Sequence, residues 1–239
     1  MTVLQPKPSL LLTEGSGQSD NGCDILAALD ADDHARLLDV STPRKVAAGE
    51  TVFLQGDHHD GIFIIRSGQM RIYYSGPSGR EITLAYWSPG NFVGGPEIFG
   101  GGQHMWSGQA VRPTELLHVR GFELRRLVNQ VPRLAVSLLE ASVHKGKCFS
   151  ALIQMLGTRS AAQRLAQLLV LMGELDGRKQ PDGIVISRTL TQEDLAKLVG
   201  TTRQWVSSTL ERFREDGIVQ VTATRILIRD DARLRVMAG

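Results

Sequence analysis

The hydrophobic pattern of this chain changes its period at Pro132, and that change limits what the chain can fold into. Before Pro132, short segments rich in β-branched and aromatic residues recur about every ten residues, with glycines between them. After it, apolar residues fall three and four positions apart for about 25 residues. The first pattern is typical of antiparallel strands joined by tight turns, and the second is typical of a long helix with one apolar face.

The N-terminal part of the chain therefore predicts an antiparallel roll or sandwich. The expected strands are residues 51–54, 62–65, 70–74, 81–87 and 116–119, preceded by a short helical region at residues 24–39. Between two of these strands, Pro77-Ser78-Gly79 is typical of a hairpin turn, since glycine readily adopts the positive φ that such turns need. Residues 1–22 are rich in Gly, Ser and other polar groups, so we expect them to form a mobile tail.

The long helix is expected over residues 131–157, because Pro132 suits a first helical turn. We expect its apolar stripe to form a dimer interface rather than to pack on its own domain, because a long helix between two domains favours self-association. The residues assigned to this interface are Leu134, Leu138, Ala141, Phe149 and Leu152. Lys145 lies in the same stripe and is a flaw in a purely apolar seam. Gly157 and Thr158 are expected to interrupt the helix and to mark a hinge.

Residues 190–214 carry the signals of two short helices joined by a tight turn. Thr191 followed by Asp194 resembles a capping box at the start of the first helix. Gly200 stands where the turn needs a left-handed residue, and Thr202 can cap the second helix. The expected flanking strands are residues 184–186, 217–221 and 225–228, with a polar loop at 176–183. Together these segments predict a winged helix-turn-helix.

The second of these helices predicts a surface for DNA. Val206, Leu210 and Phe213 fall at i, i+4 and i+7, so they are expected to pack inward. The opposite face, near the helix start, is the one that a recognition helix presents to the major groove. The residues expected to contact DNA are Thr191, Thr202, Arg203, Gln204, Ser207 and Ser208. Arg203 is expected to pair with guanine and Gln204 with adenine or cytosine, the alternative for Arg203 being a phosphate or an acidic neighbour.

Charge and cysteine content exclude several classes of protein. Residues 158–239 hold 13 Lys/Arg and 10 Asp/Glu, whereas the remainder holds 14 and 15, so the excess of cations favours a nucleic-acid partner for the C-terminal third. The two cysteines, Cys23 and Cys148, do not predict a disulfide framework or a metal cluster. No apolar run is long enough to span a membrane, and we expect a cytoplasmic protein without a cofactor or metal. No nucleophile–base constellation or phosphate-binding loop predicts an enzyme.

Taken together, these segments resemble the CRP/FNR superfamily of transcription regulators, named after the cyclic-AMP receptor protein and the fumarate-nitrate regulator. The resemblance rests on Gln55-Gly56-Asp57, residues 61–68 (GIFIIRSG), 79–82 (GREI), 89–94 (PGNFVG) and 200–210. It implies an α+β fold, in which residues 23–130 form an antiparallel β-roll like the cyclic-nucleotide-binding jelly roll. The dimerisation helix at 131–157 and a winged helix-turn-helix at 158–239 would follow. It also implies a bacterial homodimer that binds a palindromic site on double-stranded DNA, with RNA polymerase as a further partner.

The chain departs from this family where the family binds cyclic nucleotides. In the binders, a Gly-Glu pair holds the ribose, and about ten residues later an Arg followed by Ser or Thr holds the phosphate. Here no Arg or Lys occurs in residues 98–111, and Met105 and Trp106 stand at the positions of that Arg and Ser. We therefore expect an effector other than cyclic AMP, with Trp106 either filling the pocket or lining one for an apolar or aromatic molecule. The candidate pocket residues are Gly94, Gly95, Glu97, Met105 and Trp106.

Two other functions stay open at this point. The first is a cyclic-nucleotide-binding-type regulatory module of another protein, such as a kinase or a channel. The second is a regulator that needs no effector. Within the main hypothesis, haem ligation by His104 or His118 and a redox switch at Cys148 are less favoured options, because such residues are more often hydrogen-bonded or buried for structural reasons.

Overall fold

The computed structural model describes residues 24–187, 190–222 and 225–239, which belong to two compact units. The first unit ends at Ser150 and the second begins at Ala151. The predicted tail at residues 1–22 and Cys23 lie outside the described residues. In the part of the chain that the structure describes, no helix is both long and apolar enough to cross a membrane.

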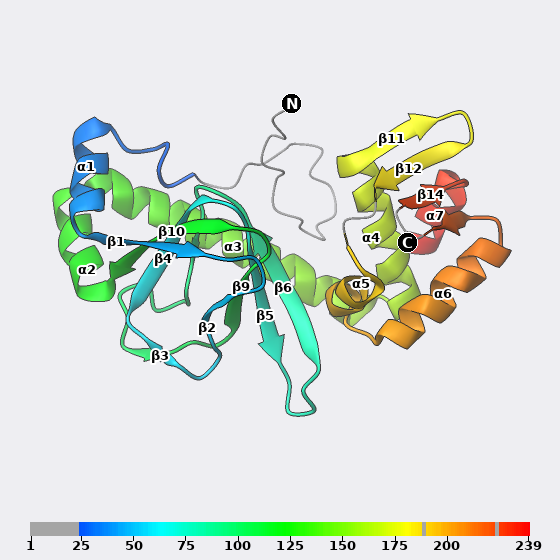
Figure 1. The fold of residues 1–239 in the computed structure, drawn as a ribbon, viewed down its shortest axis with the longest axis horizontal. Helices are drawn as coiled ribbons and strands as arrows, with labels where there is room; N and C mark the ends of the chain where they lie inside the picture. Colours follow the sequence, from blue (N-terminus) through cyan, green and yellow to red (C-terminus); the bar gives the residue numbers. More distant parts are fainter. Residues whose placement is uncertain (1–23, 188–189, 223–224) are drawn as a thin grey trace. The chain divides into compact units, whose positions relative to one another are not determined.

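The first unit is an antiparallel β-roll with helices packed on it (Figure 1). Its strands are β1 (Ser41–Val46), β2 (Thr51–Phe53), β3 (His58–His59), β4 (Gly61–Ser67), β5 (Met70–Ser75), β6 (Glu81–Trp87), β7 (Phe92–Val93), β8 (Gly102–Gln103), β9 (Ser107–Ala110) and β10 (Thr114–Arg120). Its helices are α1 (Ala31–Asp39), α2 (Gly121–Gln130) and the first part of α3 (Pro132–Thr158). The sheets have the orders β1-β10-β4-β7 and β2-β9-β5-β6, with a short β3-β8 pair. The predicted β-roll is confirmed.

Strand β4 is buried on both faces, which explains its uninterrupted run of apolar residues. Successive side chains of a strand point to opposite faces, so Ile62 and Ile64 enter one core while Phe63 and Ile65 enter another. Residues of α1, α2 and α3 complete the first core. Residues of β2, β5, β6 and β9 complete the second. The sheet that contains β4 therefore lies between a layer of helices and a second sheet.

The hairpin predicted at Pro77-Ser78-Gly79 is confirmed. Strands β5 and β6 pair in antiparallel register from Met70 opposite Trp87 to Ser75 opposite Glu81, and Gly79 has a φ of +77° in the turn. The sequence did not predict five further strands of this unit, which are β1, β3, β7, β8 and β9. Several of these are polar or only two residues long, so their sequences carry little periodicity.

The second unit is a winged helix-turn-helix, which confirms the prediction. Its elements are α4 (Ala161–Asp176), β11 (Gly177–Gln180), β12 (Gly183–Ser187), α5 (Gln192–Val199), α6 (Arg203–Glu215), β13 (Val219–Val221), β14 (Arg225–Ile228) and α7 (Asp231–Ala238). The strands form one sheet in the order β11-β12-β14-β13. The polar loop predicted at 176–183 is wrong for its first half, because β11 is a polar strand that pairs with β12 through the backbone.

The predicted break in the helix at Gly157 and Thr158 lies within one residue of the observed one. Helix α3 continues through Gly157 and ends at Thr158. The next helix begins after Ser160, whose side chain accepts a hydrogen bond from the N–H of Gln163 while the Gln163 side chain bonds back, forming a capping box. A single glycine costs a helix only about 1 kcal/mol relative to alanine, so the cap, and not the glycine, sets the boundary.

A matched pair of glycine substitutions tests this description of the second unit. Gly200 has a φ of +70°, and an added Cβ would lie 3.4 Å from Leu156, so Gly200→Ala is expected to destabilise by about 1 kcal/mol through backbone strain. Gly157 lies within α3 with open space around its Cα, so Gly157→Ala is expected to stabilise by about 0.5–1 kcal/mol. Urea unfolding of the full-length variants measures both effects. Shifts of the same sign would contradict the assigned backbone conformations.

Candidate functional site

Helix α6 presents one face of polar side chains to solvent. The chain enters it through Thr202, whose Oγ1 accepts a hydrogen bond from the N–H of Trp205 at 3.2 Å, as the sequence predicted. The exposed residues at its start are Thr202, Arg203, Gln204, Ser207 and Ser208. The inward residues are Val206, Leu210 and Phe213, each at most 2% exposed. The structure thus brings together on one surface five of the six residues predicted to contact DNA.

Local hydrogen bonds cap both ends of helix α5. The Thr191 N–H donates to Asp194 Oδ2 at 2.8 Å, and the Asp194 N–H donates to Thr191 Oγ1 at 3.1 Å, which confirms the capping box. At the other end Gly200 adopts the left-handed conformation, with φ 70° and ψ 47°. Arg164 of α4 donates from Nε to the carbonyl of Val199 at 2.7 Å. These bonds satisfy both ends of α5 and fix the turn that precedes α6.

The start of α6 suits an anionic partner. Arg203 is exposed there, and among the described residues no carboxylate forms an ion pair with it. Backbone N–H groups at a helix N-terminus add partial positive charge. Further along the helix, by contrast, Arg214 pairs with Glu211, which raises the pKa of the guanidinium and lowers that of the carboxyl. Arg203 is therefore available to an anionic ligand at the end of the helix where the polar face begins.

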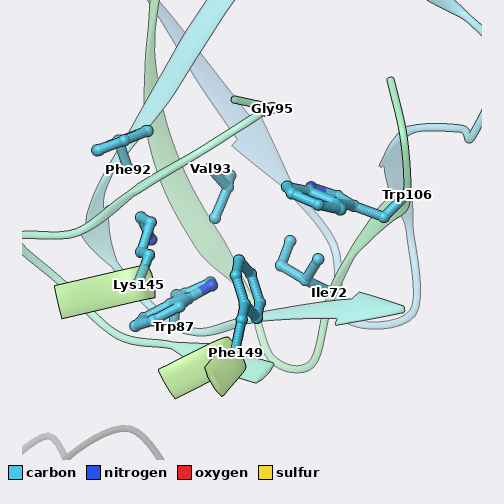
Figure 2. Close-up of a pocket in the computed structure, with 9 residues that line it drawn as sticks. Ile72, Trp87, Phe92, Val93, Gly95, Trp106, Lys145 and Phe149 are labelled. Carbon is cyan, nitrogen blue, oxygen red and sulfur yellow. The ribbon is translucent and has the colours of Figure 1, made fainter. Parts of the chain in front are cut away.

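A second candidate site is a pocket in the β-roll beside α3 (Figure 2). It is lined by Ile72, Trp87, Phe92, Val93, Gly94, Gly95, Trp106, Lys145 and Phe149. Its empty space is about 250 Å³, counting the part that is open to solvent. Trp106 reaches across to Phe149, with ring centroids 5.5 Å apart. The walls are therefore mainly aromatic and aliphatic.

The pocket contains three of the five residues predicted for it. Gly94, Gly95 and Trp106 are part of the lining. Glu97 and Met105 are exposed and lie outside the lining, Met105 with 56% of its surface accessible. Trp106 is half-buried, so it both lines the space and narrows it.

Two histidines, His59 and His104, pack against Gly94 and Gly95. A Cβ on Gly95 would lie 2.7 Å from the ring of His59, so the chain can pass there only as glycine. His104 contacts the Gly94 carbonyl through Nδ1 at 2.8 Å, and its ring centroid lies 4.5 Å from that of His59. Burial, and then the nearby His104, lower the pKa of His59. Within the described residues, no three His, Cys, Asp or Glu side chains are grouped so that they could hold a metal ion.

The residue that the sequence reasoning missed is Lys145, which it treated as a flaw in a dimer seam. As a whole Lys145 is half-buried, but its Nζ is buried and has no hydrogen-bond partner in the described part of the chain. The nitrogen lies 3.4 Å from the ring centroid of Trp87 and 4.8 Å from that of Phe92. Burial lowers the pKa of Lys145 to about 7, against a smaller opposite effect of Cys148. A cation inside an apolar repeat was the only signal available in the sequence.

The face of α3 that was predicted to form the dimer interface is not the face that the structure exposes. Leu134, Leu138 and Ala141 are at most 2% exposed and belong to the core of their own β-roll, so they are not available to a partner. Phe149 lines the pocket, and Leu152 is also buried. The large apolar residues that α3 exposes are Val136, Leu139, Val143 and Ile153, at 55%, 66%, 51% and 70%. The assignment of Leu134, Leu138 and Ala141 to a dimer interface is therefore corrected, and that of Phe149 and Leu152 stays a prediction.

The buried ammonium of Lys145 predicts a pH-dependent stability. The unfolded chain keeps this proton up to a pKa near 10.5, while the folded protein releases it at about 7, so between these values the unfolded state holds more protons and stability rises with pH. Lys145→Met should raise the free energy of unfolding by several kcal/mol at about pH 6 and by much less at about pH 9. His144 and Cys148 are the titratable neighbours on α3.

The control is Lys147→Met, because Lys147 is an exposed lysine on the same helix. Its effect on the free energy of unfolding should be small and nearly independent of pH. Urea unfolding of the two variants and the unchanged protein at both pH values measures the difference. A Lys145→Met variant that is destabilised at low pH would contradict the unpaired state of the ammonium.

Both units match known protein families. Residues 43–131 match the cyclic nucleotide-binding domain, and residues 163–237 match the Crp-like helix-turn-helix domain. The chain is 27% identical over 186 residues to a CRP-like cAMP-activated global transcriptional regulator of Mycobacterium tuberculosis, covering 78% of this chain and 83% of the relative. It is 24% identical over 246 residues to the nitrogen fixation regulation protein FixK of Bradyrhizobium diazoefficiens, covering 98% and 99%.

Solved structures share the same fold. A CooA mutant from Carboxydothermus hydrogenoformans superposes with a TM-score of 0.74 at 24% identity, covering 90% of this chain and 96% of that one. The c-di-GMP responsive regulator CLP of Xanthomonas campestris gives 0.75 at 20% identity, covering 83% and 99%. With a β-roll, a long helix and a winged helix in this order, and with both family matches in place, the chain belongs to the CRP/FNR superfamily of transcription regulators with a helix-turn-helix DNA-binding domain.

Proposed function

We propose that this protein is a homodimeric regulator that binds a palindromic DNA site and responds to an effector other than cyclic AMP. The observation that carries the DNA-binding part is the exposed polar face at the start of α6, with Arg203 and Gln204 beside a capped, positive helix end. Arginine can pair bidentately with guanine, and glutamine with adenine, in the major groove. Ser207 and Ser208 lie one turn further on and would reach bases or phosphates.

The outward row of α3 supports the homodimer. Val136, Leu139 and Val143 follow one another at spacings of three and four, and the small residues Gly146 and Ser150 continue the row toward Ile153. Such spacing is typical of a seam between two helices. Exposed large apolar side chains gathered in one row are unusual on a monomer. Two copies related by a two-fold axis would present two recognition helices, and this symmetry matches a palindromic site with half-sites about 34 Å apart.

The β-roll pocket is the proposed effector site. Glu97 lies outside it, and the segment at residues 98–111 supplies no cation for a cyclic phosphate. The similar proteins themselves differ in effector, since one is described as cAMP-activated and another as c-di-GMP responsive. The alternative, a regulatory module of a kinase or channel, is disfavoured because the same chain carries a complete winged helix. RNA polymerase is the expected partner of a regulator bound at a promoter.

Selection of binding sites from a random DNA pool tests the DNA-binding proposal, using purified protein without added ligand. We expect enrichment of a two-fold symmetric site. Arg203→Ala should weaken binding by about 1–3 kcal/mol per half-site and relax the preference at one base. Arg212→Ala is the matched control, an exposed arginine near the other end of α6, and should leave the base preference unchanged. The same preference in Arg203→Ala as in the unchanged protein would refute base readout by Arg203.

The oligomeric state tests the α3 seam. Val143→Asp places a charge in the exposed apolar row and is expected to shift the protein from dimer to monomer in sedimentation equilibrium, because a buried unpaired carboxylate opposes association. Val236→Asp is the control, since Val236 is 82% exposed on α7. Loss of the dimer in both variants, or in neither, would argue against this interface.

A further inference from the structure

Lys145 raises a question that dimerisation and DNA binding leave unanswered. Burying an ammonium without a hydrogen-bonded or charged partner is costly, and a methionine of similar length would avoid that cost. Yet Lys145 belongs to the lining of a pocket, and its nitrogen lies close to the rings of Trp87 and Phe92 (Figure 2). Unpaired buried cations in clefts are candidates for ligand binding.

We propose that this pocket binds a small aromatic carboxylate, whose anionic group pairs with Lys145 and whose ring packs against Trp87, Trp106 and Phe149. The inference rests on the proposed role of the β-roll as an effector domain. It goes further by naming the chemical class of the effector and the residue that would recognise its charge.

The charge of the ligand follows from the lining. Lys145 is the only cation among the residues that line the pocket as the structure describes it. A single ammonium in apolar surroundings matches a monoanion better than a doubly charged phosphate. A carboxyl group is ionised at neutral pH, with a pKa near 4, whereas a phenol, with a pKa near 10, is not. A carboxylate therefore suits the site without further help from the protein.

The lining residues and the small volume of the pocket indicate the shape of the ligand. The rings of Trp106 and Phe149 are tilted by 50° with centroids 5.5 Å apart, and Ile72 and Val93 complete an apolar surface. Planar rings pack well on such surfaces. The empty space of about 250 Å³ includes a part that is open to solvent, so the enclosed cavity is smaller than this and favours a small ligand over a cyclic nucleotide.

The position of Lys145 connects the pocket to the DNA-binding unit along the chain. Lys145 and Phe149 both belong to α3, which continues without a break from the first unit into the second. A ligand that pairs with Lys145 acts on the helix that carries the proposed dimer seam. The ligand would change the affinity for DNA only if it binds one conformation of that helix more tightly than another, and the size of the change is limited by this difference in affinity.

Fluorescence titration tests the proposal. The chain has three tryptophans, and two of them, Trp87 and Trp106, line the pocket, so a Trp205→Phe background reports on the pocket alone. The probes are benzoate, salicylate and phenylacetate, compared with benzamide and phenylacetamide as neutral analogues, with acetate as a non-aromatic anion, and with cyclic AMP. We expect saturable binding of at least one aromatic carboxylate, at least tenfold tighter than its amide and than acetate.

Two lysine variants assign the effect to Lys145. Lys145→Met should lose at least tenfold in carboxylate affinity and should bind the amide as before, while Lys147→Met should bind like the unchanged protein. Because Lys145→Met is expected to be the more stable protein, its unfolding would not explain the loss. Equal binding of acid and amide, retained binding in Lys145→Met, tighter binding of cyclic AMP, or no binding of any carboxylate at millimolar concentration would each overturn the proposal. DNA-site selection is a separate experiment, and its failure both without ligand and with a bound aromatic carboxylate would count against the proposed function and not against the pocket.

Discussion

The burial of strand β4 on both faces is the constraint from which much of the first unit follows. A strand that is apolar on both sides needs cover on both sides, and here one layer is a sheet and the other is helical. The helical layer uses Leu134, Leu138 and Ala141 of α3. Once these residues face the sheet, the 3.6-residue period decides which way every other side chain of α3 points. Leu139 and Val143 then point to solvent, and Lys145 points toward β6 and β7.

This explains why the helix-turn-helix could be predicted from the sequence and the roles of the faces of α3 could not. Thr191, Gly200 and Thr202 act on the backbone within four residues of their own positions, so their signals are local and complete. Helix α3 has two apolar rows instead of one, and nothing in the spacing says which row packs on the β-roll. The choice is made by the sheet, through contacts with residues some 70 positions earlier, such as Ile62 and Ile64.

The missed strands have a related cause. Strand β11 reads Gly-Arg-Lys-Gln and contains no apolar residue, yet it pairs along its length with β12, from Gly177 opposite Ile186 to Gln180 opposite Gly183. An edge strand of this kind is held by backbone hydrogen bonds and tolerates polar side chains on both faces. Its sequence therefore resembles a loop. Similarly, the pocket could be placed near Gly94 and Trp106 by resemblance, but its third wall comes from α3 and required the fold.

Lys145 shows how a stability cost can indicate function. Its aliphatic stem could cover apolar surface while the ammonium reached water, which is the usual arrangement for lysine on a helix. In this fold the nitrogen is instead turned onto the face of Trp87, where a cation–π contact offsets part of the lost hydration but supplies no hydrogen bond. An apolar residue would fill the same space without that deficit. The position is therefore better explained by a negatively charged partner that arrives from outside the chain than by the packing of the roll alone.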